Sequence, residues 1–184
     1  MTDTNYTVHT PESAPEMAAD ALRTLQSSVG LIPNLAATMA ESPALLNGFL
    51  ALRELYGKTG FSAGEVQAFS LTAAYENGCE WCVAFHTAMA LKEGVGRDVV
   101  DALRQGGVPN DGRLAALTGF ARAMVRSRGA IDSPTLQAFF AAGYSKQQAL
   151  DVVMGMAFSV MANYAGHLTR PPLDSFLTPH AWTR

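Results

Sequence analysis

The sequence predicts an all-α protein, and three observations indicate this fold class. Apolar residues recur at helical spacing along almost the whole chain, and no stretch shows the alternation of a strand. Helix-capping patterns precede several of the apolar segments. Prolines, glycines and an Asn-Gly pair separate these segments. Because 184 residues suit one domain, we expect a single helical bundle over residues 1–184.

The first elements follow from prolines and an apolar stripe. Residues 1–12 are expected to form an extended N-terminal arm, ahead of a helix over roughly 16–30. Pro33 and Pro43 stand where we expect first helical turns to begin. Proline is favoured there because the N–H that it lacks would have no hydrogen-bond partner within the helix in any case. The helix after the second of them runs to Gly57, and we expect its apolar stripe to be buried: Leu45, Leu46, Phe49, Leu50 and Leu55.

A capping box begins the next helix. Ser62 and Glu65 have the spacing at which each side chain satisfies a backbone N–H of the other residue. The apolar helix that follows runs to Asn77-Gly78, a pair that tolerates positive φ and ends helices. A further helix is expected over residues 79–93.

The second half of the chain continues the helical pattern. Shorter helices are expected over 97–105, 113–128 and 133–142. A second capping box, Ser145 with Gln148, starts a long apolar helix that ends near His167. The proline pair at 171–172 stops it, so we expect residues 171–184 to form an irregular C-terminal tail.

Composition excludes several classes of function. The net charge of −3 provides no basic surface for nucleic acid, and no apolar run reaches the roughly 18 residues of a membrane span. The N-terminus lacks the pattern of a signal peptide, so we expect a cytoplasmic protein with reduced thiols. Only 16% of residues are charged and 48% are hydrophobic, from which we expect burial at a subunit interface of a homo-oligomer.

Both cysteines of the chain lie in one motif, Cys79-x-x-Cys82, and His86 follows one helical turn later. The free amides and the dipole of a helix N-terminus stabilise a thiolate there, below the usual thiol pKa of about 8.5. Spacing i, i+3 allows a disulfide, and spacing i, i+4 places His86 on the same helix face as Cys82. His86 can therefore take the proton of Cys82 or hold its thiolate as an ion pair.

This arrangement predicts a dithiol redox cycle that needs no cofactor and no metal. One thiolate attacks an electrophile, the second thiol resolves the product to a disulfide, and an external dithiol restores the pair. We expect Cys82 to be the nucleophile because His86 faces it, and Cys79 to resolve.

Other interpretations of the motif stay open. Free cysteines are often ordinary core residues. Cys79, Cys82 and His86 could instead hold zinc in an oligomeric scaffold, although structural zinc takes four ligands and no second Cys/His pair is near. A non-catalytic redox sensor would use the same two thiols.

Residues 61–87 resemble the alkylhydroperoxidase D-like branch of the carboxymuconolactone decarboxylase family. The matching positions form the helix stop and the motif of the following helix: Asn77, Gly78, Cys79, Cys82 and His86. The resemblance implies an all-α, AhpD-like helical bundle that forms trimers or hexamers. It also implies a peroxidase in which Cys82 attacks the peroxide, Cys79 resolves and His86 relays the proton. The decarboxylases of the family, an alternative activity, generally lack the cysteine pair.

One position departs from the resemblance. The best-known peroxidases of the family have a glutamate where this chain has Gln67, and glutamine cannot accept a proton. Glu65 lies about 200° further around the helix and serves more simply as the capping partner of Ser62. The relay would then depend on His86, a water or another carboxylate such as Glu76.

Five further side chains are candidates with simpler alternatives. Trp81 could form a wall of the thiol pocket or pack in the core. His167, one turn after Asn163, could face the thiols or bond to a neighbouring helix. Arg122, Arg126 and Arg128 have few acids nearby in the sequence and are expected to form a solvated helix face, with a site for an anionic substrate as the weaker alternative.

Overall fold

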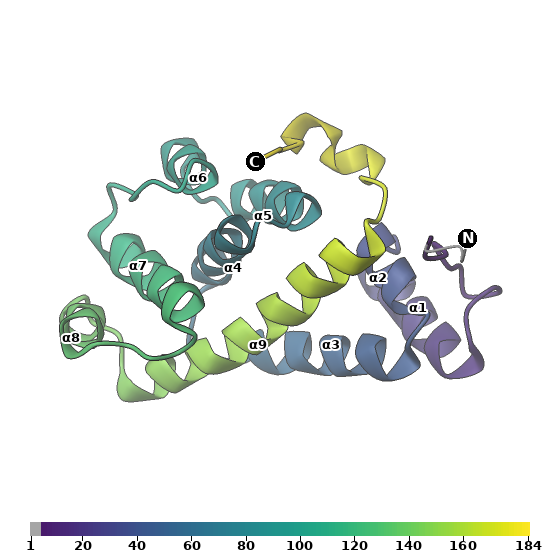
Figure 1. Ribbon diagram of the computed structural model, residues 1–184, viewed down its shortest axis with the longest axis horizontal. Coiled ribbons are helices and arrows are strands. Elements are labelled where there is room, and N and C mark those ends of the chain that lie inside the picture. Colours follow the sequence, from purple (N-terminus) through teal and green to yellow (C-terminus); the bar gives the residue numbers. More distant parts are fainter. Residues whose placement is uncertain (1–4) are drawn as a thin grey trace.

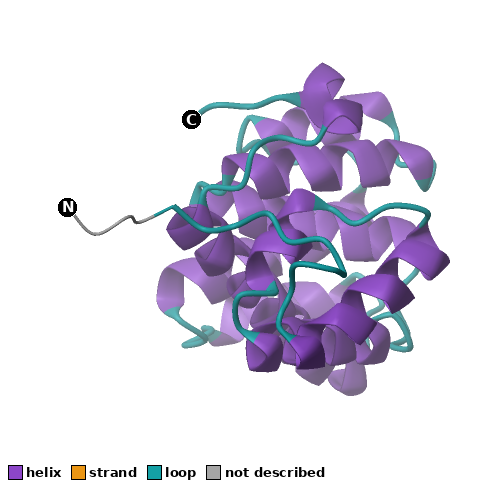
Figure 2. Ribbon diagram, turned by 90° about the vertical axis from the view of Figure 1, so that its right-hand side faces the viewer, coloured by secondary structure: helices purple, strands orange, loops and turns teal. Residues whose placement is uncertain are grey.

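The computed structural model describes residues 5–184, and this part of the chain is helical and contains no β-strand (Figures 1 and 2). The elements are α1 (Glu16–Val29), α2 (Asn34–Met39), α3 (Pro43–Tyr56), α4 (Ala63–Asn77), α5 (Glu80–Lys92), α6 (Arg97–Arg104), α7 (Gly112–Ser127), α8 (Ser133–Ala141), α9 (Lys146–Thr169) and the 3-10 helix η1 (Ser175–His180). The all-α prediction is confirmed. Residues 1–4 of the predicted arm lie outside the described part.

Local capping explains where the main helices begin. Ser62 Oγ accepts a hydrogen bond from the N–H of Glu65 at 3.2 Å, and the Glu65 carboxylate accepts one from the N–H of Ser62 at 2.8 Å. Ser145 and Gln148 form the same reciprocal pair at 3.1 and 3.0 Å. Both predicted capping boxes are therefore formed.

Helix α4 is the centre of the bundle and contacts α5, α6, α7 and α9 (Figure 1). Seven consecutive residues, 68–74, are buried, so this helix is covered on every side. A helix that is buried all round belongs to the interior of a bundle. It carries the chain directly into the turn before α5, and thereby fixes the start of α5 against the core.

Helix α9 crosses the molecule and packs against α2, α3, α4, α5 and α7 (Figure 1). By length and composition this helix is apolar enough to span a membrane, although no apolar run of that length was expected from the sequence. The core helix of a bundle passes the same test. Close packing needs Gly155, where an added Cβ would lie 2.6 Å from Cζ of Tyr56, a ring on α3 that is only 2% exposed.

Two predictions about burial and order are wrong. Of the expected stripe on α3, Leu46 is buried and Leu45, Phe49 and Leu50 are half-buried. Leu55 is 51% exposed, because the inward-facing line of the helix runs on from Phe49 to the buried Tyr56 about two turns later. The tail 171–184 is not wholly irregular, since it contains η1, which packs against α5.

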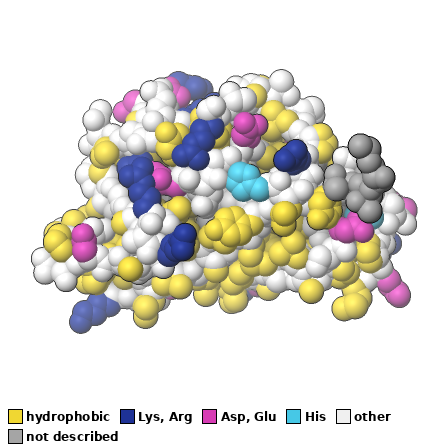
Figure 3. All heavy atoms as spheres, viewed as in Figure 1, with side chains coloured by type: hydrophobic (Ala, Val, Ile, Leu, Met, Phe, Trp, Pro, Cys, Tyr) yellow, Lys and Arg dark blue, Asp and Glu magenta, His cyan; other side chains and the backbone are white. Residues whose placement is uncertain are grey.

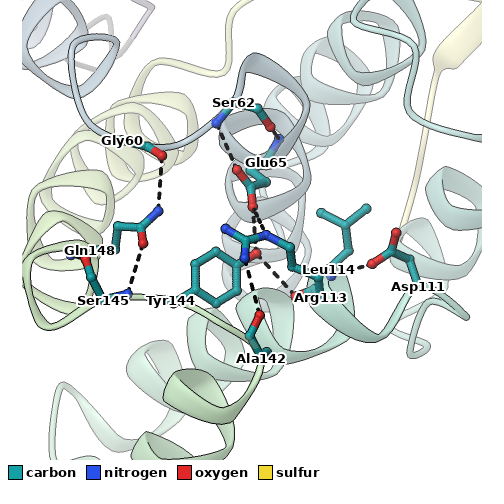
Figure 4. A network of polar contacts seen from close by, with 10 residues as sticks. All are labelled: Gly60, Ser62, Glu65, Asp111, Arg113, Leu114, Ala142, Tyr144, Ser145 and Gln148. Carbon is teal, nitrogen blue, oxygen red and sulfur yellow. Dashed lines mark hydrogen bonds and ion pairs between the residues drawn. The ribbon is translucent and has the colours of Figure 1, made fainter.

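A polar network ties the start of α4 to α7 and α9 (Figure 4). The Glu65 carboxylate accepts hydrogen bonds from Arg113 Nε at 2.9 Å and from the Tyr144 hydroxyl at 2.8 Å. The Arg113 guanidinium also lies over the Tyr144 ring, 4.1 Å from its centroid. Burial alone would raise the pKa of Glu65, but the bonds from Ser62, Tyr144 and Arg113 hold it below its usual value. Glu65 is thus a structural carboxylate.

Candidate active site

The turn between α4 and α5 places the cysteines. Gly78 has a φ of 71°, a left-handed conformation that glycine adopts without strain, and it ends α4 as predicted. Cys79 is the N-cap of α5, and its Sγ accepts a hydrogen bond from the N–H of Cys82 at 3.4 Å. The sulfurs therefore lie at the N-terminal end of α5, where unpaired amides favour negative charge.

The two cysteines form a disulfide, with their Cα atoms 5.3 Å apart. Cys79 is 3% exposed and Cys82 is 1% exposed, so both belong to the core. Helix α9 approaches them at Gly166, where an added Cβ would lie 2.9 Å from Cys79 Sγ and 3.8 Å from Cys82 Sγ. Any larger side chain at this position would press on the sulfurs.

His86 is buried on α5, one helical turn after Cys82. Its Nδ1 lies 2.9 Å from Gln67 Oε1, and because an amide oxygen only accepts, Nδ1 carries the hydrogen and Nε2 keeps a lone pair. Burial lowers the pKa of His86 to about 4. The imidazole is therefore neutral near pH 7, so the expected ion pair of an imidazolium with the thiolate is replaced by a neutral base.

Gln67 takes the place in which the resemblance has a glutamate, and it contacts the predicted histidine directly. It fixes the tautomer of His86 without adding a negative charge. Glu76, the other carboxylate considered for the relay, is 6% exposed at its side chain and pairs with Arg122 and Arg126 at 2.8 Å each. The expectation of a solvated arginine face is wrong for Arg122, whose side chain is 14% exposed, but Arg126 and Arg128 are exposed as expected. Glu76 is occupied by its two arginine partners.

The structure brings Trp81 and His167 to the disulfide but not Glu65, which belongs to the network at the other end of α4. Trp81 Nε1 donates to Asp174 at 2.9 Å. His167 Nε2 donates to the carbonyl of Asn77 at 2.8 Å, which is the interhelical bond considered as its alternative role. Both side chains also line a cavity that reaches Cys79.

This cavity has a volume of about 710 Å³, and its far wall is the C-terminal segment 170–184. Arg170, Leu173 and Trp182 belong to that wall, and the sequence analysis assigned them no part in the site. The segment turns back over α5 after leaving α9 (Figure 1). The sequence indicated only that the proline pair ends α9, and not that the tail returns to α5.

The described residues contain no group of three or more His, Cys, Asp or Glu side chains placed to hold a metal ion. In the disulfide state neither sulfur is a free thiolate. Thiolate is the form that binds zinc, so this state offers no zinc site at the motif.

Replacing Gln67 by glutamate is expected to raise the pKa of His86. A carboxylate 2.9 Å from Nδ1 would stabilise the imidazolium, by about one to three pKa units for a charge at this range. The titration of the His86 ring protons by NMR measures the shift, and Gln137→Glu on the exposed part of α8 is the control. An unchanged pKa in Gln67→Glu would contradict the contact between the two side chains.

Comparisons with known proteins agree with this fold. Residues 43–123 match the model of the carboxymuconolactone decarboxylase family. No curated protein matched the sequence.

Several solved structures share the architecture. An uncharacterized peroxidase-related protein of Ralstonia eutropha JMP134, described as an alkylhydroperoxidase AhpD core, has a TM-score of 0.82 at 20% identity, with 94% of this chain and 93% of that chain covered. A peroxidase-related protein of Silicibacter sp. TM1040 has a TM-score of 0.74 at 21% identity, covering 89% and 87%. The debrominase Bmp8 has a TM-score of 0.77 at 18% identity, covering 98% and 96%.

At such identities the solved structures establish the fold alone. The family model covers the segment from α3 to α7, which includes the disulfide and His86. The chain therefore has the AhpD core fold, and its residues 43–123 match the model of the carboxymuconolactone decarboxylase family.

Proposed function

We propose that the protein is a thiol-dependent peroxidase that reduces peroxides through a Cys79–Cys82 disulfide cycle assisted by His86. The observation that carries this proposal is the disulfide itself, formed at the start of α5 within one turn of a buried, neutral imidazole. The AhpD core fold and the family match support it at the level of a peroxidase-related enzyme.

The cycle begins with both thiols reduced. His86 Nε2 takes the proton of Cys82, and the thiolate attacks one oxygen of the peroxide O–O bond. The sulfur gains OH as a sulfenic acid, and the departing alkoxide receives the proton from His86 and leaves as an alcohol. Cys79 then attacks the sulfenic sulfur, the disulfide forms and water leaves.

An external dithiol completes the cycle by returning two electrons and two protons to the disulfide. A reducing compartment such as the cytoplasm would supply it. The cavity at Cys79 gives this partner a direct path to one sulfur of the disulfide.

A homo-oligomer, trimeric or hexameric, is part of the proposal. Helix α9 has four large apolar side chains that are more than half exposed: Leu150, Val153, Tyr164 and Leu168. No Asp, Glu, Lys or Arg lies between 152 and 169 on this helix. Hydrophobic side chains gather over α9 and α3 on the face in Figure 3. An uncharged apolar face of this kind is typical of a subunit interface.

Stoichiometry tests the peroxidase proposal. We expect the reduced protein to consume one peroxide per disulfide formed, and to consume many when dithiothreitol is supplied. The measurements are the loss of peroxide and the mass of the protein, which is two hydrogens lighter once the disulfide has formed. One oxidation without dithiol-driven turnover would favour a redox sensor instead.

A second candidate is the reductive removal of halogen from an organic halide. The debrominase Bmp8 shares the fold, and a cysteine-to-alanine variant of it was solved with 2,3,4-tribromopyrrole. Two thiols can supply the two electrons: one sulfur takes the halogen, the carbon takes a proton, and the second thiol displaces halide to form the same disulfide. Bromide release from 2,3,4-tribromopyrrole, measured by ion chromatography, separates the two candidates.

A further inference from the structure

The cavity at Cys79 is far larger than hydrogen peroxide requires. Its volume of about 710 Å³ lies within the range of sites for organic ligands of drug-like size. The start of α5 and the end of α9 form one side, where Cys79 and Gly166 reach the lining. Because Cys79 itself lines the cavity, a molecule bound there lies beside one sulfur of the redox centre.

The opposite wall is held in place by hydrogen bonds rather than left loose. Trp182 Nε1 donates to the carbonyl of Arg104 at 3.0 Å, and Arg104 donates in return to the carbonyls of His180 and Ala181 at 3.0 Å each. Trp81 Nε1 donates to Asp174, which also accepts from the N–H of Asn34 at the start of α2. The cavity is therefore formed before any ligand enters.

The lining combines apolar and cationic groups. Both tryptophans of the chain, Trp81 and Trp182, face it together with Leu173. Indole rings supply a large apolar surface at little cost in conformational entropy. This part of the wall suits a hydrocarbon or aromatic group.

The cationic part is unneutralised. Arg170 lines the cavity, and within residues 5–184 its guanidinium has no hydrogen bond or ion pair. Arg184 approaches the same rim, with Nη1 3.0 Å from the position of a Cβ on Gly78. Within the described lining Glu80 is the one acidic residue and Arg170 the one arginine, and Arg184 adds a second guanidinium at the rim. A guanidinium without a partner is a ready site for a carboxylate.

We propose that this cavity selects amphipathic organic hydroperoxides that bear a carboxylate, with the apolar body against Trp81 and Trp182 and the carboxylate on Arg170. The reaction in this inference rests on the proposed peroxidase function, whereas the class of ligand rests on the lining of the cavity alone. It predicts that a fatty-acid hydroperoxide is a better substrate than its methyl ester, and that hydrogen peroxide makes no use of the cationic wall.

Kinetics with matched substrates test the selection. Linoleic acid hydroperoxide and its methyl ester differ only in the charge. We expect kcat/KM to favour the acid by about fivefold, the effect of one partly exposed ion pair. Arg170→Gln should remove this preference, and Arg170→Lys should restore part of it.

Arg128 provides the matched control. Like Arg170 it is an exposed arginine in a left-handed conformation at a helix C-cap, with φ of 54° against 44°, and it does not line the cavity. Arg128→Gln should behave as the wild type. Equal preference in the two glutamine variants would overturn the assignment of the carboxylate to Arg170.

Tryptophan fluorescence tests the ligand class without any turnover. Because both tryptophans lie at the cavity, binding there must change the emission of the oxidised protein. We expect the hydroxy acid of linoleate to bind about fivefold more tightly than its methyl ester, and Arg170→Gln to abolish the difference. Equal binding of acid and ester by the wild type would overturn the inference. If no hydroperoxide is consumed but the acid preference in binding holds, the peroxidase proposal fails and the ligand class stands.

Discussion

Serine at position 82 is expected to abolish dithiol-driven peroxide turnover. The hydroxyl of serine cannot form the disulfide with Cys79, and it is too weakly acidic to give up its proton to His86 near neutral pH. Losing a nucleophile of this kind costs about a thousandfold or more in kcat. Peroxide consumption in a coupled dithiothreitol assay is the measurement.

Cys79→Ser is the matched variant, because it removes the resolving sulfur and keeps the nucleophile. It should consume one peroxide per subunit and then stop, with the sulfenic acid trapped by a dimedone reagent. Turnover of Cys82→Ser at the wild-type rate would refute the peroxidase assignment. Turnover of a carboxymuconolactone by a variant without either cysteine would instead favour the decarboxylase alternative.

Alanine at position 155 is expected to cause the largest loss of stability among the glycine sites of α9. The new Cβ would lie 2.6 to 2.8 Å from two ring carbons and the hydroxyl oxygen of the buried Tyr56, and this side chain has no exposed side toward which to move. Overpacking of this kind costs about 2 kcal/mol even after the better helix propensity of alanine is included. Urea denaturation followed by circular dichroism measures the free energy of unfolding.

Gly119→Ala on α7 separates packing from propensity. A Cβ at this helical glycine meets no atom within 4 Å, so the substitution should be neutral or stabilising by up to about 1 kcal/mol. Equal effects at positions 155 and 119 would contradict the close crossing of α9 over Tyr56.

The parts of the site that depend on neighbouring residues could be predicted from the sequence. The capping box at Ser62, the helix stop at Gly78 and the disulfide spacing of Cys79 and Cys82 all act within one or two turns. Physical preferences at such distances are strong enough to be identified without the fold. The long-range contact of His86 with Gln67 could be predicted only in part, because only the resemblance connected position 67 with the proton relay.

The far wall of the cavity and the arginine pairs could not be predicted. Trp182 bonds to Arg104 across 78 residues, and Arg122 bonds to Glu76 across 46. A sequence window shows which acids lie near an arginine along the chain, whereas the packing of α7 against α4 decides which acid it meets. Burial also depends on how the helices pack, so the lowered pKa of His86, which burial causes, could not be predicted from the sequence either.

The claim on which the account depends is that the sulfur of residue 82 ionises readily once reduced, with a neutral base and free helix amides beside it. The pH titration of thiolate absorbance for reduced wild type, Cys79→Ser and Cys82→Ser tests it most directly. We expect a thiolate that forms below the ordinary thiol pKa of about 8.5 in wild type and Cys79→Ser, and is absent in Cys82→Ser. Titration of both sulfurs at or above that value in every variant would contradict the account.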